Sequence, residues 1–282
     1  MRIDLHLHTT ASDGTDTPAE LVKRAWDAGI KVISITDHDT IAGLAEAHAA
    51  LPAGMCFFNG IELSSAVYGE GGFRCHILGY DFDIKSCAIA GAIDEGMRKR
   101  REKLYARLDY IKEKFGITFS DEDVKELESF NSVSKLHIAR LLIKDGYATD
   151  ISDAMDRYFG VNAPDDRIDA TLAIDSIRAA RGLSVWAHPL GGEREPRIDA
   201  DELYRRAKIL KDMGVDGIEA YYSRYNAADR AMILDVARRL SLWVSGGSDY
   251  HGMNKTVPLG LLDADGKSVT TMSLSICDIL MP

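Results

Sequence analysis

Two histidines one residue apart, His6 and His8, lie near the start of the chain in MRIDLHLHTTASDG, and Asp13 follows them. Apolar and polar residues alternate from Arg2 to Leu7, which is the period of a β-strand whose alternate side chains share a face. The two imidazoles would then point the same way from the end of one strand. That arrangement suits a metal ion, but the His-x-His spacing alone leaves open both a metal site and a chance pairing.

Potential metal ligands also lie in or directly after most of the other predicted strands. The segment VISITDHD places His38 between Asp37 and Asp39 after an apolar run. The segments FFNGIELS, FRCHILGYDF, SVWAHP and VSGGSDYH supply further histidines and carboxylates: Glu62, His76, His188, Asp249 and His251. Because the carboxyl ends of strands gather on one side of β/α barrels and of open α/β sheets, we expect these side chains to converge.

This set of ligands predicts a site for more than one metal ion. Nitrogen and oxygen ligands without cysteine suit Zn, Mn or Fe, and Mg less well. The set exceeds what one ion with about four to six ligands can use. Glu62 is the natural bridge, since the two oxygens of a carboxylate can hold two cations. Asp37, beside a ligand, is expected to orient His38 for catalysis rather than to bind metal.

Alternating strand and helix patterns must position these residues. Strands are expected at 2–7, 31–36, 56–63 and 73–82, and helices at 16–30 and 40–51. In the first helix Thr17 is expected to cap, with Pro18 at the first helical position and Glu20 three residues after the cap. From residue 172 onward, three helix-then-strand pairs follow. About seven strands therefore alternate with helices, which predicts an α/β fold with helices outside a largely parallel sheet.

Residues 94–162 interrupt this alternation. Charged amphipathic helices are expected at 93–116, 120–128, 133–147 and 150–160, with no strand between them. We therefore expect a catalytic barrel built from residues 1–93 and 163–282 and a helical insert over 94–162 that acts as a lid over the substrate. The basic run RKRRE at 98–102 is expected to be a solvated helix face.

Composition excludes several classes of protein. The chain has 282 residues, of which 46% are hydrophobic, enough for one large domain with an insert. Its formal net charge of -10 argues against an extended basic surface for nucleic acid, but not against a small anionic substrate that metals help to bind. The 4 cysteines form no C-x-x-C pair and are expected to be reduced. Without a membrane-length apolar run or a signal peptide, we expect a cytoplasmic protein.

Taken in order, DLHLHTTASDGT, ITDHDTIAGLAEA, NGIELS, CHILGYDFD, VWAHP and GGSDYHG resemble the successive motifs of the PHP (polymerase and histidinol phosphatase) family of metal-dependent phosphoesterases. The resemblance extends over essentially the whole chain. It implies a distorted (β/α)7 barrel with a trinuclear site at the C-terminal face. It also implies three ligand sets: His6, His8, Glu62 and Asp249; Asp13, His38 and His251; and Glu62, His76 and His188. Asp13 stands where other members have His, which favours Mn over Zn there, while Zn or Fe stays possible for the site as a whole.

The motifs most resemble the subgroup that acts on small phosphate esters. The expected reaction is hydrolysis of a nucleotide 3′,5′-bisphosphate or a cyclic ribose or nucleoside phosphate by a hydroxide that bridges two metals. The segments HPLGGERE and NAPDDRID differ in sequence from many relatives at positions that are expected to contact substrate. A 5′-3′ exonuclease on short RNA or DNA ends, an amidohydrolase-type C–N hydrolase and a non-catalytic metal module remain as alternatives.

Four residues outside the ligand sets are candidates for substrate binding. His137 and Arg140 in SKLHIAR are three residues apart and share a helix face, and His137 is also expected to supply the acid for the leaving oxygen. Tyr222 and Arg224 in YYSRYN follow a strand. Arginine suits bidentate contact with phosphate, although a surface ion pair is the alternative for each arginine.

Overall fold

The computed structural model of the protein describes residues 1–159, 164–192 and 196–281. A curved sheet forms its centre, with strands in the order β1-β2-β3-β4-β6-β7-β8 and the short β5 paired with β3 outside this path. The strand bounds are β1 (Ile3–Leu7), β2 (Val32–Ile35), β3 (Cys56–Val67), β4 (Phe73–Tyr80), β5 (Ile168–Asp169), β6 (Leu183–Trp186), β7 (Gly217–Tyr222) and β8 (Trp243–Gly247).

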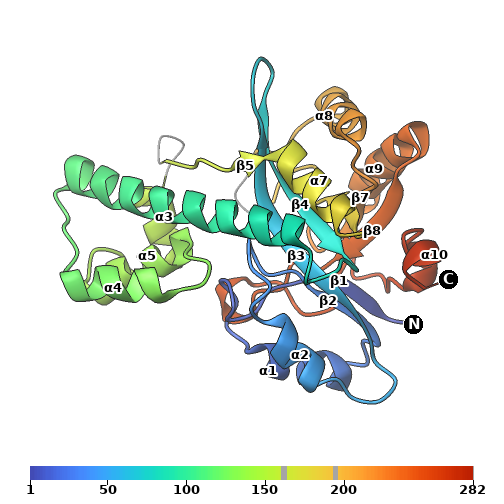
Figure 1. The fold of residues 1–282 in the computed structure, drawn as a ribbon, viewed down its shortest axis with the longest axis horizontal. Helices are drawn as coiled ribbons and strands as arrows, with labels where there is room; N and C mark the ends of the chain where they lie inside the picture. Colours follow the sequence, from blue (N-terminus) through green and yellow to red (C-terminus); the bar gives the residue numbers. More distant parts are fainter. Residues whose placement is uncertain (160–163, 193–195, 282) are drawn as a thin grey trace.

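The sheet nearly closes into a barrel of seven strands, as predicted. Strands β1 and β8 meet through hydrogen bonds from Asp249 N to His6 O (2.9 Å) and from His8 N to Tyr250 O (3.0 Å). Neighbouring strands are parallel except that β4 is antiparallel to both β3 and β6. The short turn between β3 and β4 causes this departure, because a hairpin can join only antiparallel strands. The β3–β4 hairpin extends beyond the barrel (Figure 1).

A glycine allows β8 to approach β1 closely enough for this near closure. A Cβ atom added at Gly247 would lie 2.1 Å from the Cβ of His6 and 2.5 Å from its backbone nitrogen. Any other residue at this position would push β8 away from β1, and with it the ligands that follow each strand.

Helices cover the outside of the barrel and form the insert (Figure 1). Helix α1 begins with the predicted capping box between Thr17 and Glu20. The helix bounds are α1 (Pro18–Asp27), α2 (Leu44–Ala49), α3 (Cys87–Phe115), α4 (Asp121–Ser129), α5 (Lys135–Lys144), α6 (Ile151–Tyr158), α7 (Ala170–Ala179), α8 (Ala200–Met213), α9 (Ala227–Leu240) and α10 (Cys277–Leu280). None of the helices in the described ranges is long and apolar enough to cross a membrane.

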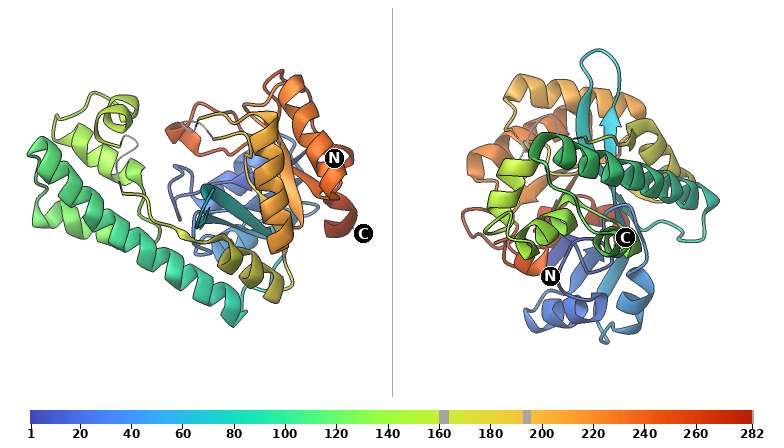
Figure 2. Two further views of the ribbon diagram at one scale, coloured as in Figure 1. Left: turned by 90° about the horizontal axis from the view of Figure 1, so that it is seen from above. Right: turned by 90° about the vertical axis from the view of Figure 1, so that its left-hand side faces the viewer.

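The insert has a hydrophobic core of its own. Buried side chains from Leu104 to Phe159 form a cluster separate from the barrel core. Helix α3 starts at Cys87, before the expected boundary at 94, and contacts both α7 and β5 before it runs out into the insert (Figure 2). The other expected boundary, at 162–163, lies outside the described residues.

Candidate metal centre and active site

Glu62, fully buried on β3, lies at the centre of the predicted ligands. Its Oε2 atom is close to three imidazole nitrogens: His8 Nε2 at 3.0 Å, His38 Nδ1 at 3.1 Å and His6 Nε2 at 3.2 Å. Its Oε1 atom is 2.6 Å from His76 Nδ1 and 3.2 Å from His188 Nε2. Imidazoles therefore surround both oxygens of one carboxylate, an arrangement that suits a carboxylate bridging two cations.

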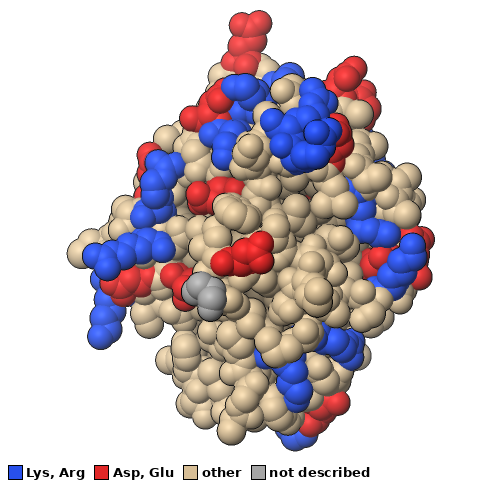
Figure 3. Space-filling view, turned by 90° about the vertical axis from the view of Figure 1, so that its right-hand side faces the viewer, with Lys and Arg blue, Asp and Glu red and all other residues tan. Residues whose placement is uncertain are grey.

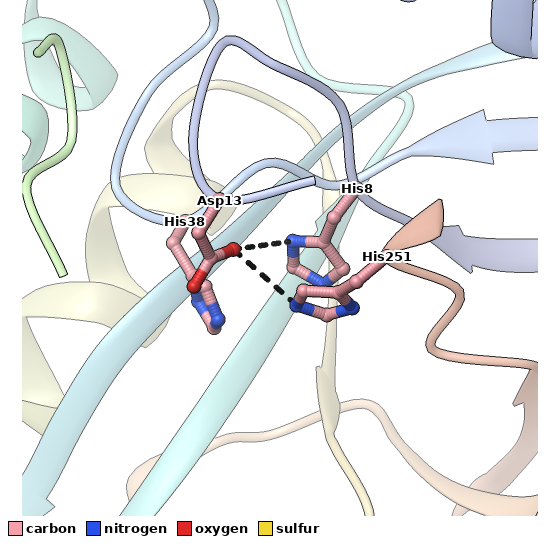
Figure 4. A group of neighbouring side chains, drawn as sticks. All are labelled: His8, Asp13, His38 and His251. Atoms are coloured by element: carbon pink, nitrogen blue, oxygen red, sulfur yellow. Dashed lines mark ion pairs between the residues drawn. The ribbon is translucent and has the colours of Figure 1, made fainter. Parts of the chain in front are cut away.

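The donor atoms form three overlapping sets, in each of which all atoms lie within 4.8 Å of one another: His6, His8, Glu62 and Asp249; His8, Asp13, His38 and His251; and His38, Glu62 and His76. Figure 4 shows the second set, where Asp13 Oδ1 is 3.3 Å from His251 Nε2 and 4.0 Å from His8 Nδ1. The first set equals the one that the resemblance implied. The second set gains His8, and the third holds His38 in place of His188.

These residues fit divalent metal ions. Several buried donor atoms have no hydrogen-bond partner in the described part of the chain: His6 Nε2, His8 Nδ1, His8 Nε2, His38 Nδ1 and Glu62 Oε2. A buried polar atom without a partner costs about 1–3 kcal/mol, so a cluster of them calls for a ligand. Imidazole nitrogens and carboxylate oxygens together suit Mn, Fe or Zn.

The protonation states also suit metal binding. Burial, together with repulsion from His251, lowers the pKa of His8 to about 3. Burial also lowers the pKa of His38 and of His76 below the usual value. Although burial raises the pKa of Glu62, attraction to the surrounding histidines holds it well below its usual value. His6 differs: although burial lowers its pKa, attraction to Glu62, Glu219 and Asp249 holds the pKa well above the usual value. Neutral imidazoles at His8, His38 and His76 beside an ionised carboxylate are the forms that coordinate a metal, whereas His6 has to release its proton when a metal binds.

Glu219 on β7 supports two of the histidines, and the sequence-based ligand set did not include it. Its Oε1 atom is 3.1 Å from Nδ1 of His6, and its Oε2 atom accepts a 2.8 Å hydrogen bond from the backbone nitrogen of His188. With Nδ1 of His6 engaged, Nε2 is left to face the metal site. A carboxylate inside the otherwise apolar strand GIEAYY is the signal that could have identified it, because a buried charge needs partners.

Asp249 is held from behind by two other side chains. Its Oδ2 atom accepts hydrogen bonds from the Tyr222 hydroxyl (2.9 Å) and from Lys255 Nζ (2.6 Å). Its Oδ1 atom faces His8 Nε2 at 3.4 Å. Tyr222, expected to contact substrate, is buried and instead orients Asp249, because its ring packs inside the barrel. Lys255 was not predicted from the sequence.

Asp37 also differs from expectation. Its carboxylate accepts hydrogen bonds from Thr9 N (2.8 Å), Thr9 Oγ1 (2.7 Å) and Ser12 Oγ (2.5 Å). Asp37 thus fixes the loop that carries Asp13, rather than orienting His38. Adjacent residues in an extended chain point to opposite sides, which separates the side chains of Asp37 and His38.

The insert residues expected to bind substrate make other contacts. His137 Nδ1 accepts a 2.9 Å hydrogen bond from Ser134 N in the cap of α5, and its ring stacks on Phe130 at 3.9 Å. Burial lowers the pKa of His137 to about 4, so the ring is neutral at pH 7, which does not suit the expected acid. Arg140 donates a 2.8 Å hydrogen bond to Asn254 Oδ1 of the loop after β8.

A basic cavity of about 200 Å³ lies between the metal centre and the insert. His38 and His76 of the metal centre line it, and so do five cations: Arg100, Lys103, Arg107, Lys135 and Arg167. Its carboxylates are Asp13 and Asp165. Arg224 is exposed and is not among the described residues that line this cavity.

Arg100 corrects the expectation of a fully solvated face at 98–102. It is buried, its Nε atom donates to Asp39 Oδ2 (2.5 Å), and its Nη2 atom donates to Ser64 Oγ (2.9 Å). Arg98 and Glu102 remain exposed, as expected. Arg100 therefore ties helix α3 of the insert to the loop after β2.

We expect Asp39→Ala to destabilise the protein by about 3–5 kcal/mol, because it leaves the Arg100 guanidinium buried without its carboxylate. The free energy of unfolding in urea measures this change. Asp109→Ala, on the part of α3 that lies in the insert, is the matched control and should change stability little. A loss below 1 kcal/mol for Asp39→Ala would show that the pair does not hold the insert.

Three non-glycine residues of this region have left-handed backbone conformations: Asp39 (φ 52°), His188 (φ 29°) and Asp249 (φ 57°). L-residues adopt this region at a cost, and such residues concentrate at functional sites where their surroundings hold them in place. Here the strained positions coincide with two predicted metal ligands and with the partner of Arg100.

Known proteins resemble the chain along most of its length. Residues 4–167 match the model of the PHP domain. A 5′-3′ exoribonuclease of Haemophilus influenzae is 34% identical over 257 residues, which cover 89% of this chain and 90% of the relative. A 3′,5′-nucleoside bisphosphate phosphatase of Chromobacterium violaceum is 32% identical, and the match covers 88% of this chain and 87% of that protein.

A solved structure agrees with these relatives. It is described as a metal-dependent phosphoesterase from Bifidobacterium adolescentis and superposes with a TM-score of 0.79 at 28% identity, covering 94% of this chain and 93% of its own. The matched domain covers more than half of the chain and includes Glu62 and most of the ligand sets. The chain therefore belongs to the PHP domain family.

Proposed function

We propose that this PHP phosphoesterase hydrolyses an ester of a nucleoside phosphate that carries a second phosphate, with nucleoside 3′,5′-bisphosphates as the model substrates. The basic cavity beside the metal centre carries this proposal. The reacting phosphate would lie among the three ligand sets, and the second phosphate would lie in the basic cavity. The C. violaceum phosphatase, 32% identical to this chain, supports the same substrate class.

The basic cavity holds more positive charge than its own carboxylates balance. Burial, with repulsion from Arg100 and Arg107, lowers the pKa of Lys103 to about 7. Burial and repulsion from Arg107 lower the pKa of Lys135 to about 8. Asp165 pairs with Lys103 (3.2 Å) and Arg107 (3.2 Å). A phosphate bound here would relieve the repulsion among cations that the fold holds close together.

The metal centre would supply the rest of the chemistry. Two or three divalent ions, with Mn favoured by Asp13, would neutralise the oxygens of the reacting phosphate and activate water. Glu62 would hold two of them at a fixed separation, and Glu219 would keep the His6 ring in the required orientation. Asp249 would offer Oδ1 while Tyr222 and Lys255 hold its Oδ2.

Figure 3 shows the face of the molecule that lies on the right in Figure 1. Lys and Arg gather at its top and lie among Asp and Glu at its sides, and the charged side chains in its middle are acidic. No basic stripe runs across this face, which supports a substrate bound in the basic cavity rather than along an extended basic surface.

Lys135 provides the test of this proposal. We expect Lys135→Met to lower kcat/KM for adenosine 3′,5′-bisphosphate by about tenfold or more, because a charge-assisted contact is worth roughly 1.5–3 kcal/mol. The value for p-nitrophenyl phosphate, which has no second phosphate, should change far less. Lys125→Met, exposed on neighbouring α4, is the matched control. Equal losses on both substrates would contradict a second-phosphate site.

The pH dependence of kcat/KM for the bisphosphate, compared with that for p-nitrophenyl phosphate, gives a further prediction. As the pH rises through about 7 and then about 8, Lys103 and Lys135 lose their protons in the free enzyme, so the cavity attracts an anion less strongly. We expect kcat/KM for the bisphosphate, relative to p-nitrophenyl phosphate, to fall between about pH 7 and 9, since kcat/KM reports the free enzyme. In Lys135→Met this fall should be smaller. A ratio that rises over this range would contradict the proposed role of the lysines.

A further inference from the structure

The segment after β8, residues 251–255, holds the loop that carries Asp13. The side chain of Asn254 donates a 2.6 Å hydrogen bond from Nδ2 to the backbone oxygen of Asp13. The Nε2 atom of His251, in the same segment, lies 3.3 Å from Asp13 Oδ1. The segment therefore contacts both the backbone and the carboxylate of a predicted metal ligand.

A glycine lets this segment lie against the loop after β1. Gly252 has a left-handed backbone conformation (φ 64°), and a Cβ atom added to it would collide with Thr15 Oγ1. The next residue, Met253, donates a 2.9 Å hydrogen bond from its backbone nitrogen to the same oxygen. The two loops are thus in direct contact, so a shift of one changes the position of the other.

Helix α5 of the insert contacts the segment through Arg140. Its Nη2 atom donates a 2.8 Å hydrogen bond to Asn254 Oδ1. The amide of Asn254 is therefore engaged at both ends, because its oxygen accepts from the insert and its nitrogen donates to Asp13. Arg140 itself is not among the described residues that line the basic cavity. These two hydrogen bonds join the insert to the metal centre.

We propose that Arg140 is a positioning residue that acts through Asn254 to hold Asp13 in place for metal binding. A docked insert would then strengthen binding of the ion in the second ligand set (Figure 4). The bound ion would in turn hold the insert more firmly, since coupling between two binding events is reciprocal. The inference rests on the metal centre of the proposed function and not on the substrate proposed there.

The direction of the effect separates positioning from simple electrostatics. Arg140 places a positive charge two hydrogen bonds away from Asp13. Because like charges repel, charge alone predicts that a metal ion binds more tightly once Arg140 is removed. Loss of positioning predicts the opposite, which is weaker binding of the ion.

Calorimetry during titration of the metal-free full chain with Mn²⁺ measures the affinities. Arg140→Ala, at an exposed position, should weaken one class of Mn site about fivefold, the net value of one hydrogen bond. Asn254→Ala should weaken the same class about tenfold, the lower end of what is typical for a contact behind a ligand. The double variant should bind Mn as Asn254→Ala does, since residues that act through one another are not additive.

Lys144→Ala is the matched control. It removes a positive charge one turn further along α5, where Lys144 pairs with Asp123 inside the insert at 2.8 Å. This variant should leave the Mn affinities unchanged. Thermal unfolding of each metal-free variant should stay close to that of the unchanged protein, so that a fall in affinity reports the metal centre rather than the stability of the fold.

The outcomes separate this inference from the proposed function. Weaker Mn binding in Arg140→Ala but not in Lys144→Ala, with no further loss in the double variant, supports the inference. Unchanged or tighter binding in Arg140→Ala overturns it, and so do additive losses in the double variant. A wild-type protein that binds Mn but does not cleave the bisphosphate overturns the proposed substrate and leaves the inference standing. A wild-type protein that binds no Mn overturns the metal centre of the proposed function itself.

Discussion

Replacement of Glu62 by glutamine should lower kcat by roughly 10³-fold or more, which corresponds to about 4 kcal/mol of transition-state stabilisation. Both carboxylate oxygens face imidazole nitrogens at 2.6–3.2 Å, and no other carboxylate in the described ligand sets belongs to more than one of them. A neutral amide offers one acceptor oxygen and no charge, so it cannot balance two dications. Turnover with excess Mn measures the fall in kcat, and elemental analysis measures the loss of bound metal.

Glu122→Gln is the matched control for this change, since Glu122 is exposed on α4. It should leave both turnover and bound metal at the level of the unchanged protein. Glu62→Gln should retain the fold, because the side chains have nearly the same shape. Wild-type turnover from a metal-loaded Glu62→Gln protein would show that Glu62 does not bridge the ions.

Glu219→Gln should weaken metal binding by about 10–100-fold, as is typical when the carboxylate behind a ligating histidine is lost. Glu219 contacts Nδ1 of His6 and the backbone nitrogen of His188. The Nε2 atoms of both histidines face Glu62 instead. Calorimetry during titration of the metal-free protein with Mn gives the affinity directly.

The same experiment distinguishes orientation from simple loss of stability. Thermal unfolding of the metal-free Glu219→Gln protein should stay close to that of the unchanged protein, while the stabilisation produced by Mn should shrink. Unchanged Mn affinity would rule out a role for Glu219 in orienting His6. Glu122→Gln again serves as the control.

The sequence was sufficient to predict the barrel, and the side chains predicted to bind metal lie together around Glu62. His6 and His8 share a strand face, and a strand fixes that relation locally. Thr17 and Glu20 form a capping box that four adjacent residues determine. The gathering of ligands after successive strands follows from the α/β architecture itself, so Glu62, His38 and Asp249 could be placed together without coordinates.

The supporting contacts could not be predicted in the same way, because they join distant parts of the chain. Glu219 meets His6 across 213 residues, and Arg100 meets Asp39 across 61. Neither distance leaves a local pattern. Local patterns also misled where a side chain had two possible partners: Tyr222 was expected to contact substrate after a strand, but it is the last residue of β7, packs inward and donates to Asp249.

Release of phosphate from adenosine 3′,5′-bisphosphate, followed as metal-stripped protein is titrated with Mn²⁺, tests the central claim most directly. The arrangement of Glu62 among the three ligand sets predicts no turnover without metal, and turnover that rises until two or three equivalents of Mn are bound per chain. Turnover by protein that holds less than one equivalent of metal, or no phosphate release at full loading, would contradict a metal-dependent phosphoesterase of this substrate class.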